Sequence, residues 1–464
     1  MGKLTNTSQN EVINLGIYKS EEEAQADDFA NIPVPMKYRH KWNHIMFVWF
    51  GAAMVAQLYQ AGVYLAIGTG NLANAFYSVI GGALFLGLFV ALNGVIGQKT
   101  GCNCALSSTF AYGSKGVVIP AFHIADIGWY VVNIAIFSNI LHEITPAIDA
   151  RVYCILFCYL FITNGYIGFN QMVILNKVAA PILIIVSVIG LIKVQIMNPG
   201  GIPALFDKVF PTELSVAGGI TAVIGTWSAG ASRAADYFRY AKTKKDTFLA
   251  SLCGFAIGFI LCIGCGVIWG GFSETAQIAK TLMLLGIVVL GAIMFFVQTW
   301  TTSEHSAYIT STSLPLVIQT IFKKKVPRRF IVLFCGVVGI IIAGLDIQNY
   351  YVPFISLLGA VIPVLGGVVI ADFFIVSRTK YHWTGHKNIY EMNVLSEDLQ
   401  HHKLNIATIP ALIAGVWVSL AVKAGVASIN GLLAAILVYI LCSILFYYLG
   451  ITKNEKRKNE ALQQ

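Results

Sequence analysis

Long apolar segments, separated by short polar ones, follow one another along almost the whole chain. Each has about 20 residues, the length that an α-helix needs to cross a hydrocarbon core about 30 Å thick. The pattern therefore predicts an all-α integral membrane protein. Its twelve expected transmembrane helices lie at about 44–69, 74–97, 117–140, 151–169, 176–197, 215–238, 248–271, 280–303, 330–346, 352–377, 404–422 and 429–450.

The composition agrees with this pattern. Hydrophobic residues make up 57% of the 464 residues and charged residues only 11%, against roughly 25% charged residues in soluble domains. We expect a single transmembrane domain over residues 44–450, with polar cytoplasmic tails at 1–43 and 451–464. The first tail shows no signal-peptide pattern.

The net charge of +9 is concentrated in loops on one side of the predicted membrane. If the N-terminus is cytoplasmic, basic clusters such as Lys242, Lys244 and Lys245 also fall on the cytoplasmic side. The other side receives Arg151, Lys193, Lys208, Lys280 and Lys423. Positive charge marks cytoplasmic loops, so we expect a protein of the cell membrane with both termini on the cytoplasmic side. The basic surplus then orients the protein, and we expect no nucleic-acid partner.

We assign no chemical role to two other features. Cys262 and Cys265 form a C-x-x-C inside an apolar span, where packing explains them better than metal binding. The long loop at 378–403 is expected to be solvated and could cap the inner face of the protein.

Glycines interrupt two of the predicted helices. The first span contains Gly51, Gly62, Gly68 and Gly70, together with Gln57 and Gln60 near its middle. The sixth has Gly225 and Gly230 on either side of Trp227. Glycine-interrupted segments at matching positions in two halves are typical of transporter sites at an inverted-repeat interface. Alternatively, these glycines only let helices approach closely.

The third span carries a polar stripe. His123, Asp126, Tyr130 and Asn133 are spaced so that they share one helical face, and Trp129 lies beside them. Polar groups at membrane depth face the bundle interior or a watery cavity. The stripe is interpreted as part of a site for a planar, hydrogen-bonding ligand. The alternative is a structural network between helices.

The sixth span adds Trp227 among small residues, as a second stacking surface or as an ordinary buried aromatic. Arg233 and Asp236, three residues apart, are expected to pair with each other or with neighbours. We interpret them as gate or scaffold.

The eighth span ends in the densest polar cluster at membrane depth, formed by Gln298, Thr301, Thr302, Ser303, Glu304, His305 and Ser306. Threonine hydroxyls and backbone carbonyls suit a small hard cation, although threonines also bond to their own helix. Glu304 and His305 could instead carry a proton. The cluster does not decide between a metal cation and a proton as the coupling ion.

Four motifs together resemble the nucleobase-cation symporter family, in particular its cytosine permease branch. They are HIADIGWYVV, GTWSAGASRAADYFRY, WTTSEHSAYIT and FISLLGAVIPVLGGVVIADFF, in this order, and the likeness runs from about Pro33 to the last span. The resemblance implies two five-helix inverted repeats, at about 44–197 and 215–377, with the first and sixth helices broken. Two extra helices follow at about 404–450. It also implies import of a nucleobase or related heterocycle with sodium, or sometimes with a proton.

The resemblance implies site residues as well. Trp129 and Trp227 match the aromatic residues that sandwich the planar base, and Asp126 falls where cytosine permeases tend to have an amide. The other expected substrate-binding residues are Ala56, Thr226, Ser303, Glu304 and His305. The expected sodium ligands come from Gly51, Ala52, Val55, Gln298, Thr301 and Thr302. No other cofactor is expected.

One departure from the family pattern bears on specificity. Asp126 and Glu304 are carboxyls where cytosine permeases tend to present amides. A carboxylate only accepts hydrogen bonds. The substitution suggests a substrate rich in N–H donors, or a cationic one, rather than cytosine.

Three functional classes remain to be compared. A secondary transporter fits the polar residues at membrane depth, and the chain has no G-x-x-x-x-G-K-[ST] loop for ATP. A membrane-embedded hydrolase using His123 or His305 lacks the accompanying G-x-S-x-G and H-E-x-x-H motifs. A channel would show unsaturated flux without ion coupling. The sequence favours the transporter.

Overall fold

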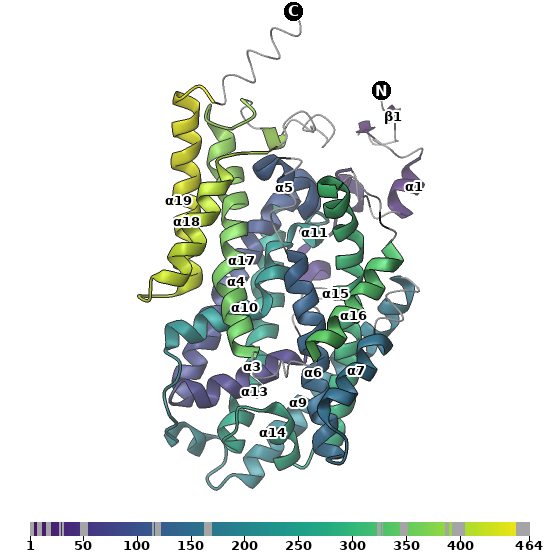
Figure 1. Cartoon of the computed structure of the whole chain (residues 1–464), viewed down its shortest axis with the longest axis vertical. Coiled ribbons are helices and arrows are strands. Elements are labelled where there is room, and N and C mark those ends of the chain that lie inside the picture. The colour runs from purple at the N-terminus through teal and green to yellow at the C-terminus, as the bar shows by residue number, and fades with distance from the viewer. Residues whose placement is uncertain are drawn as a thin grey trace, which may run out of the picture.

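The structure is a computed structural model, mainly helical, that describes most of the chain (Figure 1). The described residues are 4–6, 12–14, 20–26, 29, 32–46, 54–113, 116, 122–161, 169–322, 326, 328–343, 351–385, 389–391 and 404–451.

The N-terminal half starts with a small antiparallel sheet and then enters the long helices. Its elements are β1 (Leu4–Asn6), β2 (Val12–Asn14), α1 (Glu21–Ala26), η1 (Met36–Tyr38), α3 (Gln57–Gly68), α4 (Leu72–Thr100), α5 (Cys104–Tyr112), α6 (Phe122–Ile144), α7 (Ala150–Leu160), α9 (Phe169–Met197), η3 (Pro203–Asp207) and α10 (Val216–Ser232).

The C-terminal half continues the series to the last two helices. Its elements are α11 (Ala235–Phe238), α12 (Lys244–Leu249), the π-helical η4 (Ala250–Ala256), α13 (Ile257–Ser273), α14 (Ile278–Leu284), α15 (Val288–Phe322), α16 (Arg328–Ala343), α17 (Tyr351–Phe374), η6 (Val376–Arg378), η7 (Ile389–Glu391), α18 (Thr408–Ala421) and α19 (Ala427–Tyr448).

Several helices have the length and composition of membrane spans. Within the described residues, five qualify, at Leu72–Thr100, Ala125–Ile144, Lys244–Ser273, Tyr351–Arg378 and Ala427–Tyr448. Shorter apolar helices lie at Pro181–Met197, Val288–Ser303 and Thr408–Ala421. On α19, Leu433, Leu437, Leu441 and Leu445 are all exposed at four-residue spacing. An outward apolar stripe of this kind fits a helix that faces lipid rather than water.

The predicted break in the first span is present, whereas the one in the sixth lies elsewhere. Residues 54–56 are not helical, and α3 begins at Gln57. By contrast, α10 runs without interruption past Gly225 and Gly230. The chain turns only at Arg233 and Ala234, before α11. The expectation that the sixth helix breaks around Trp227 is therefore wrong.

Close helix packing explains Gly225 of α10, Gly359 of α17 and Gly62 of α3. A Cβ atom on Gly225 would lie 1.6 Å from the backbone oxygen of Ile355 in α17, and one on Gly359 would lie 2.1 Å from the backbone oxygen of Thr221. Gly62 of α3 meets α13 in the same way, with the Ile263 oxygen 2.2 Å from its virtual Cβ. At these positions the packing alternative holds, because only a residue without a side chain permits the contact.

The eighth predicted span, 280–303, is also divided differently. The short α14 ends at Leu284, Gly286 adopts a φ of +65° in the turn, and α15 then continues for 35 residues to Phe322. Hydropathy falls near residue 303 because polar residues such as Ser303 and Ser306 interrupt the apolar run. Both serines are buried within α15. The helix therefore continues beyond the residue at which the apolar pattern ends.

The helices pack in two sets that matter for the site. In one, α6 lies along α15 and α7; in the other, α10 lies along α4 and α17. The last two helices, α18 and α19, pack on each other and against α17, at one side of the molecule (Figure 1).

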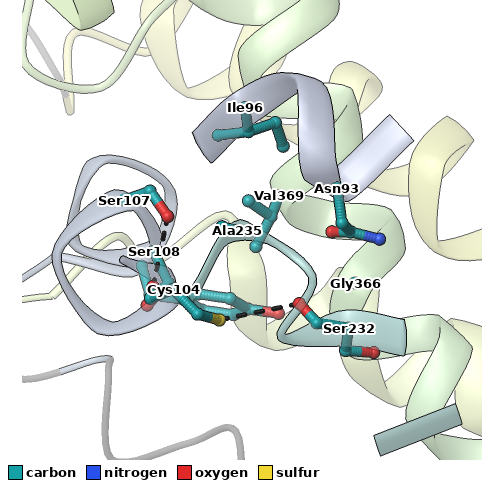
Figure 2. A pocket seen from close by; sticks show the side chains of 10 residues that line it. Asn93, Ile96, Cys104, Ser107, Ser108, Ser232, Ala235, Gly366 and Val369 are labelled. Carbon is teal, nitrogen blue, oxygen red and sulfur yellow. Dashed lines mark hydrogen bonds between the residues drawn. The ribbon is translucent and has the colours of Figure 1, made fainter. Parts of the chain in front are cut away.

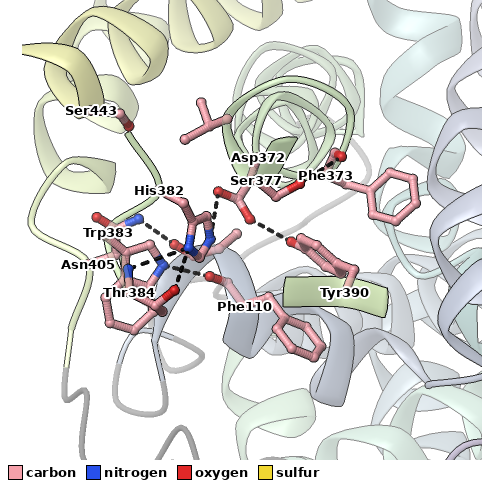
Figure 3. A network of polar contacts seen from close by, with 12 residues as sticks. Phe110, Asp372, Phe373, Ser377, His382, Trp383, Thr384, Tyr390, Asn405 and Ser443 are labelled. Carbon is pink, nitrogen blue, oxygen red and sulfur yellow. Dashed lines mark hydrogen bonds and ion pairs between the residues drawn. The ribbon is translucent and has the colours of Figure 1, made fainter. Parts of the chain in front are cut away.

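The described part of the loop after α17 is packed rather than solvated, which corrects the expectation for 378–403. His382, Trp383 and Tyr390 are buried. The Asp372 carboxylate of α17 accepts a hydrogen bond from the Tyr390 hydroxyl at 2.6 Å (Figure 3) and another from the Tyr439 hydroxyl at 2.7 Å. His382 Nε2 lies 3.3 Å from Asp372 Oδ1. This network ties the loop to α17 and α19. Residues 392–403 lie outside the described part.

Candidate functional site

The polar stripe of α6 faces other helices, as predicted. Tyr130 donates its hydroxyl to the Cys158 carbonyl of α7, and the Asn133 amide donates to Thr302 Oγ1 of α15 at 3.2 Å. Asp126 contacts the end of α10, and Trp129 contacts α17. Three residues of the stripe and the neighbouring Trp129 thus meet four different helices. The His123 side chain lies outside the described residues.

Trp129 is only 7% exposed. Its ring lies edge-on to Phe354 of α17, with centroids 5.3 Å apart and an interplanar angle of 73°. Phe354 also covers Gly128, where a Cβ would lie 2.6 Å from the ring. Phe354 was not among the expected site residues. Its place at the start of the FISLLGAVIP motif was the only available signal.

Asp126 and Arg233 form a bidentate ion pair. Arg233 Nη1 donates to Asp126 Oδ2 and Nη2 to Oδ1, both at 2.8 Å. The side chains are 14% and 6% exposed, for Arg233 and Asp126 respectively. Asp236 instead accepts from the Cys104 amide at 2.7 Å, at the start of α5. Of the two predicted pairings of Arg233, the one with a neighbouring helix is present.

Trp227 is half-buried and lies edge-on to Phe255, with centroids 5.4 Å apart. Its indole covers Gly230, where a Cβ would lie 2.0 Å from the ring. Gly230 therefore makes room for the indole. The adjacent Thr226 is buried and donates its hydroxyl to the Val223 carbonyl at 2.6 Å. Only the oxygen lone pairs of Thr226 remain available to a ligand.

The threonines of α15 bond first to their own helix. Thr301 Oγ1 and Thr302 Oγ1 both donate to the Gln298 carbonyl, at 2.9 and 2.7 Å. Ser303 Oγ, on the following residue of α15, and Asn133 Oδ1, on the amide that bonds Thr302, are buried and have no hydrogen-bond partner among the described residues. Orphaned buried oxygens call for a water or an ion. The oxygen donors present here fit a small hard cation.

The structure covers only part of the predicted sites. Val55 and Ala56 are buried in the non-helical stretch before α3, and their carbonyls accept from the Leu58 and Tyr59 amides, each at 3.1 Å. Gly51 and Ala52, and the side chains of Glu304 and His305, lie outside the described residues. The contributions expected from these four positions remain predictions.

Gln60, a polar residue of the first span, forms a structural link to the segment before α14. Gln60 of α3 donates from Nε2 to the Ala276 carbonyl at 2.7 Å, and its Oε1 accepts from the Ile278 amide at 3.0 Å. It thereby holds the segment before α14 against α3. Nearby, the Tyr351 hydroxyl of α17 donates to the Gln57 carbonyl at 3.1 Å.

Two hollows among the described residues are lined by neither Trp129 nor Trp227. One is a cavity of about 10 Å³ beside the turn after α10, enough for about one water. Polar side chains line much of it, namely Asn93, Cys104, Ser107, Ser108, Tyr112 and Ser232 (Figure 2). The other is an apolar groove on α18 that includes the exposed Trp417. At 7% exposure, Trp129 is largely covered by protein.

A family model and two bacterial permeases match most of this chain. A family model described as "Permease for cytosine/purines, uracil, thiamine, allantoin" matches residues 33–452. The cytosine permease of Escherichia coli (strain K12) is 23% identical over 422 residues, covering 90% of this chain and 94% of that protein. A putative allantoin permease from the same strain is 24% identical over 417 residues, covering 81% and 84%.

Solved structures share the fold. The inward-facing conformation of Mhp1 matches with a TM-score of 0.71 and 15% identity, covering 90% of this chain and 94% of that one. Mhp1, named there as a nucleobase-cation-symport-1 family transporter, in a closed conformation with bromovinylhydantoin bound, matches with a TM-score of 0.69, also at 15% identity, covering 91% and 96%. These matches and the family model confirm the resemblance. The chain belongs to the nucleobase-cation symporter family, among the permeases for cytosine, purines, uracil, thiamine and allantoin.

Proposed function

We propose that this chain is a secondary active transporter that imports a nucleobase or a related planar nitrogen heterocycle by alternating access. The observation that carries the proposal is the contact between α6 and the end of α10, where Arg233 binds Asp126. Each of these helices also carries one of the two indoles, Trp129 and Trp227. Aromatic faces with nearby hydrogen-bonding groups are typical of sites for planar bases.

The names of the relatives support a planar heterocycle as substrate. Cytosine and allantoin appear in the names of two permeases, and bromovinylhydantoin is bound in one structure of Mhp1. All three molecules are small nitrogen heterocycles or carry one. We therefore expect the substrate of this chain to be of that size and shape.

We assign sodium rather than a proton as the coupling ion. The support comes from oxygen atoms on α15 and α6. Thr301 and Thr302 carry hydroxyls on α15, and Ser303 Oγ and Asn133 Oδ1 are buried without a hydrogen-bond partner among the described residues. The backbone at Gly51, Ala52, Val55 and Gln298 is expected to complete this site. Each sodium ion that enters the cell releases roughly 2.3 kcal/mol of free energy per 100 mV of membrane potential, and this energy can drive substrate accumulation.

The proposed location is the cell membrane, with both termini in the cytoplasm. The positive charge of the loops supports this orientation. So does the position of β1 and of the C-terminal end of α19 at the same end of the molecule (Figure 1).

A ligand panel on the purified protein tests the proposal. Melting temperatures are measured with nucleobases, hydantoins and related heterocycles, with and without sodium and at two pH values. A ligand that binds only the folded state raises the melting temperature. We expect at least one heterocycle to do so, more strongly with sodium. Stabilisation that depends on pH but not on sodium would contradict the sodium assignment, and the absence of any stabilising heterocycle would contradict the substrate class.

A further inference from the structure

We infer that Arg233 selects the substrate: its guanidinium, held by Asp126, presents N–H donors and favours neutral rings that carry carbonyl oxygens. The inference rests on the proposed function and names the substrate class for the same site. It replaces Asp126 by Arg233 as the residue that meets the ligand.

The ion pair leaves no uncompensated charge on Asp126. Both carboxylate oxygens accept from Arg233 at 2.8 Å, and a carboxylate and a guanidinium together are neutral. A cationic ligand would have to displace Arg233 from two charge-assisted bonds and leave that guanidinium without its counter-charge in a buried site. Cationic heterocycles should therefore be rejected, contrary to the hypothesis based on a free carboxyl.

The polar edge that remains accessible belongs to Arg233. A guanidinium has five N–H donors, and two of them are used on Asp126. Among the described residues, the Arg233 side chain donates to no other acceptor. It is also the more exposed partner, at 14% against 6%. Among the described residues, three donors thus have no acceptor, and ring carbonyl oxygens of a ligand would be suitable ones.

The pair is positioned by the helices that carry the indoles. Asp126 precedes Trp129 by three residues on α6, about one helical turn, and Arg233 follows Trp227 by six residues at the end of α10. Arg233 lies where α10 stops, so its side chain extends from the helix end across to α6. Along the helices, Asp126 and Arg233 therefore lie within about two helical turns of the indole on the same helix.

Competition binding on the full-length protein in saturating sodium tests the inference. Uracil and hydantoin serve as neutral probes with ring carbonyls, and benzamidine and 2-aminoimidazole serve as cationic probes rich in N–H groups. We expect the neutral probes to bind at least tenfold more tightly. Equal or tighter binding of the cationic probes would overturn the inference and leave the transporter proposal standing. If no ring of either kind binds, both fail.

Two variants test the role of Arg233 directly. Arg233→Lys keeps the charge but loses the planar fork, and uracil binding should weaken about tenfold. Asp126→Asn leaves the guanidinium charge uncompensated, so the anionic ring orotate should gain affinity relative to uracil. A merely structural ion pair would not produce that gain. Arg151→Lys, in the exposed pair with Asp149, is the matched control. Unchanged uracil binding by Arg233→Lys, or no gain for orotate in Asp126→Asn, would refute the assignment.

Discussion

At the scale of single residues, the account depends first on Trp129 and Trp227. Stacking of a base on an aromatic ring contributes about 1 to 3 kcal/mol. We predict that Trp129→Ala and Trp227→Ala each weaken substrate binding tenfold or more in an equilibrium binding assay. Trp417→Ala, on the outer face of α18 where the indole is 66% exposed, should leave affinity unchanged. Equal behaviour of all three variants would contradict the assignment of the stacking surfaces.

A second residue-scale prediction concerns the buried Asp372 carboxylate (Figure 3). Tyr390→Phe removes the 2.6 Å hydrogen bond from its hydroxyl to Asp372. A hydrogen bond to a charged group contributes about 1.5 to 3 kcal/mol, so the melting temperature in detergent should fall. The control is Tyr448→Phe, whose hydroxyl is exposed and 3.5 Å from that of Tyr381. If both variants melt like wild type, the network does not stabilise the loop after α17.

Residue spacing predicted part of the site and missed the rest for a physical reason. The intervals between Asp126, Tyr130 and Asn133 fix one helical face, because the period of the α-helix is known. The partner of Asp126 is 107 residues away along the chain. Its identity depends on how α6 and α10 cross, which no local pattern encodes. The same holds for Phe354 against Trp129.

At the scale of helices, close contact between α10 and α17 depends on glycine. Gly225→Ala would place a Cβ 1.6 Å from the Ile355 carbonyl oxygen, which forces the helices apart. Overpacking of this kind costs about 1 to 3 kcal/mol, so we predict a lower melting temperature. Gly68→Ala is the matched control, because its nearest neighbour would be 3.4 Å away, in ordinary contact. Equal melting temperatures for the two variants would show that α10 and α17 do not need this approach.

Helices were predicted well where they are apolar and poorly where they are not. The apolar run of α4 gave its position closely, at 74–97 against Leu72–Thr100. In α15, buried hydroxyls lower the hydropathy, so the second half of a 35-residue helix was not predicted. The interruption after α10 was misplaced because glycine serves both broken helices and close packing. Only the contact with α17 decides between them.

At the scale of the whole molecule, the two sets of helices are linked at the site. The Asp126–Arg233 pair joins α6 of one set to α10 of the other. Within the first set, Asn133 joins α6 to Thr302 of α15. A cation bound beside Thr302 would therefore act on the helix that carries Trp129. Because coupling between two binding sites is reciprocal, sodium should raise substrate affinity and substrate should raise sodium affinity.

This coupling predicts the effect of Thr302→Val, which removes the hydroxyl and keeps the shape. Sodium should no longer increase substrate affinity, although binding without sodium is retained. Binding isotherms at low and high sodium measure the effect. Thr145→Val, at an exposed hydroxyl that donates to the Leu141 carbonyl, should keep the full response. Normal sodium stimulation of Thr302→Val would reject the cation site.

Uptake by proteoliposomes tests the central claim most directly. Purified protein is reconstituted, and accumulation of radiolabelled uracil or hydantoin is followed with an inward sodium gradient and again after the gradient is collapsed. The account predicts saturable accumulation of the unchanged ligand that requires the gradient. Chemical conversion of the ligand, or flux that neither saturates nor responds to sodium, would contradict it.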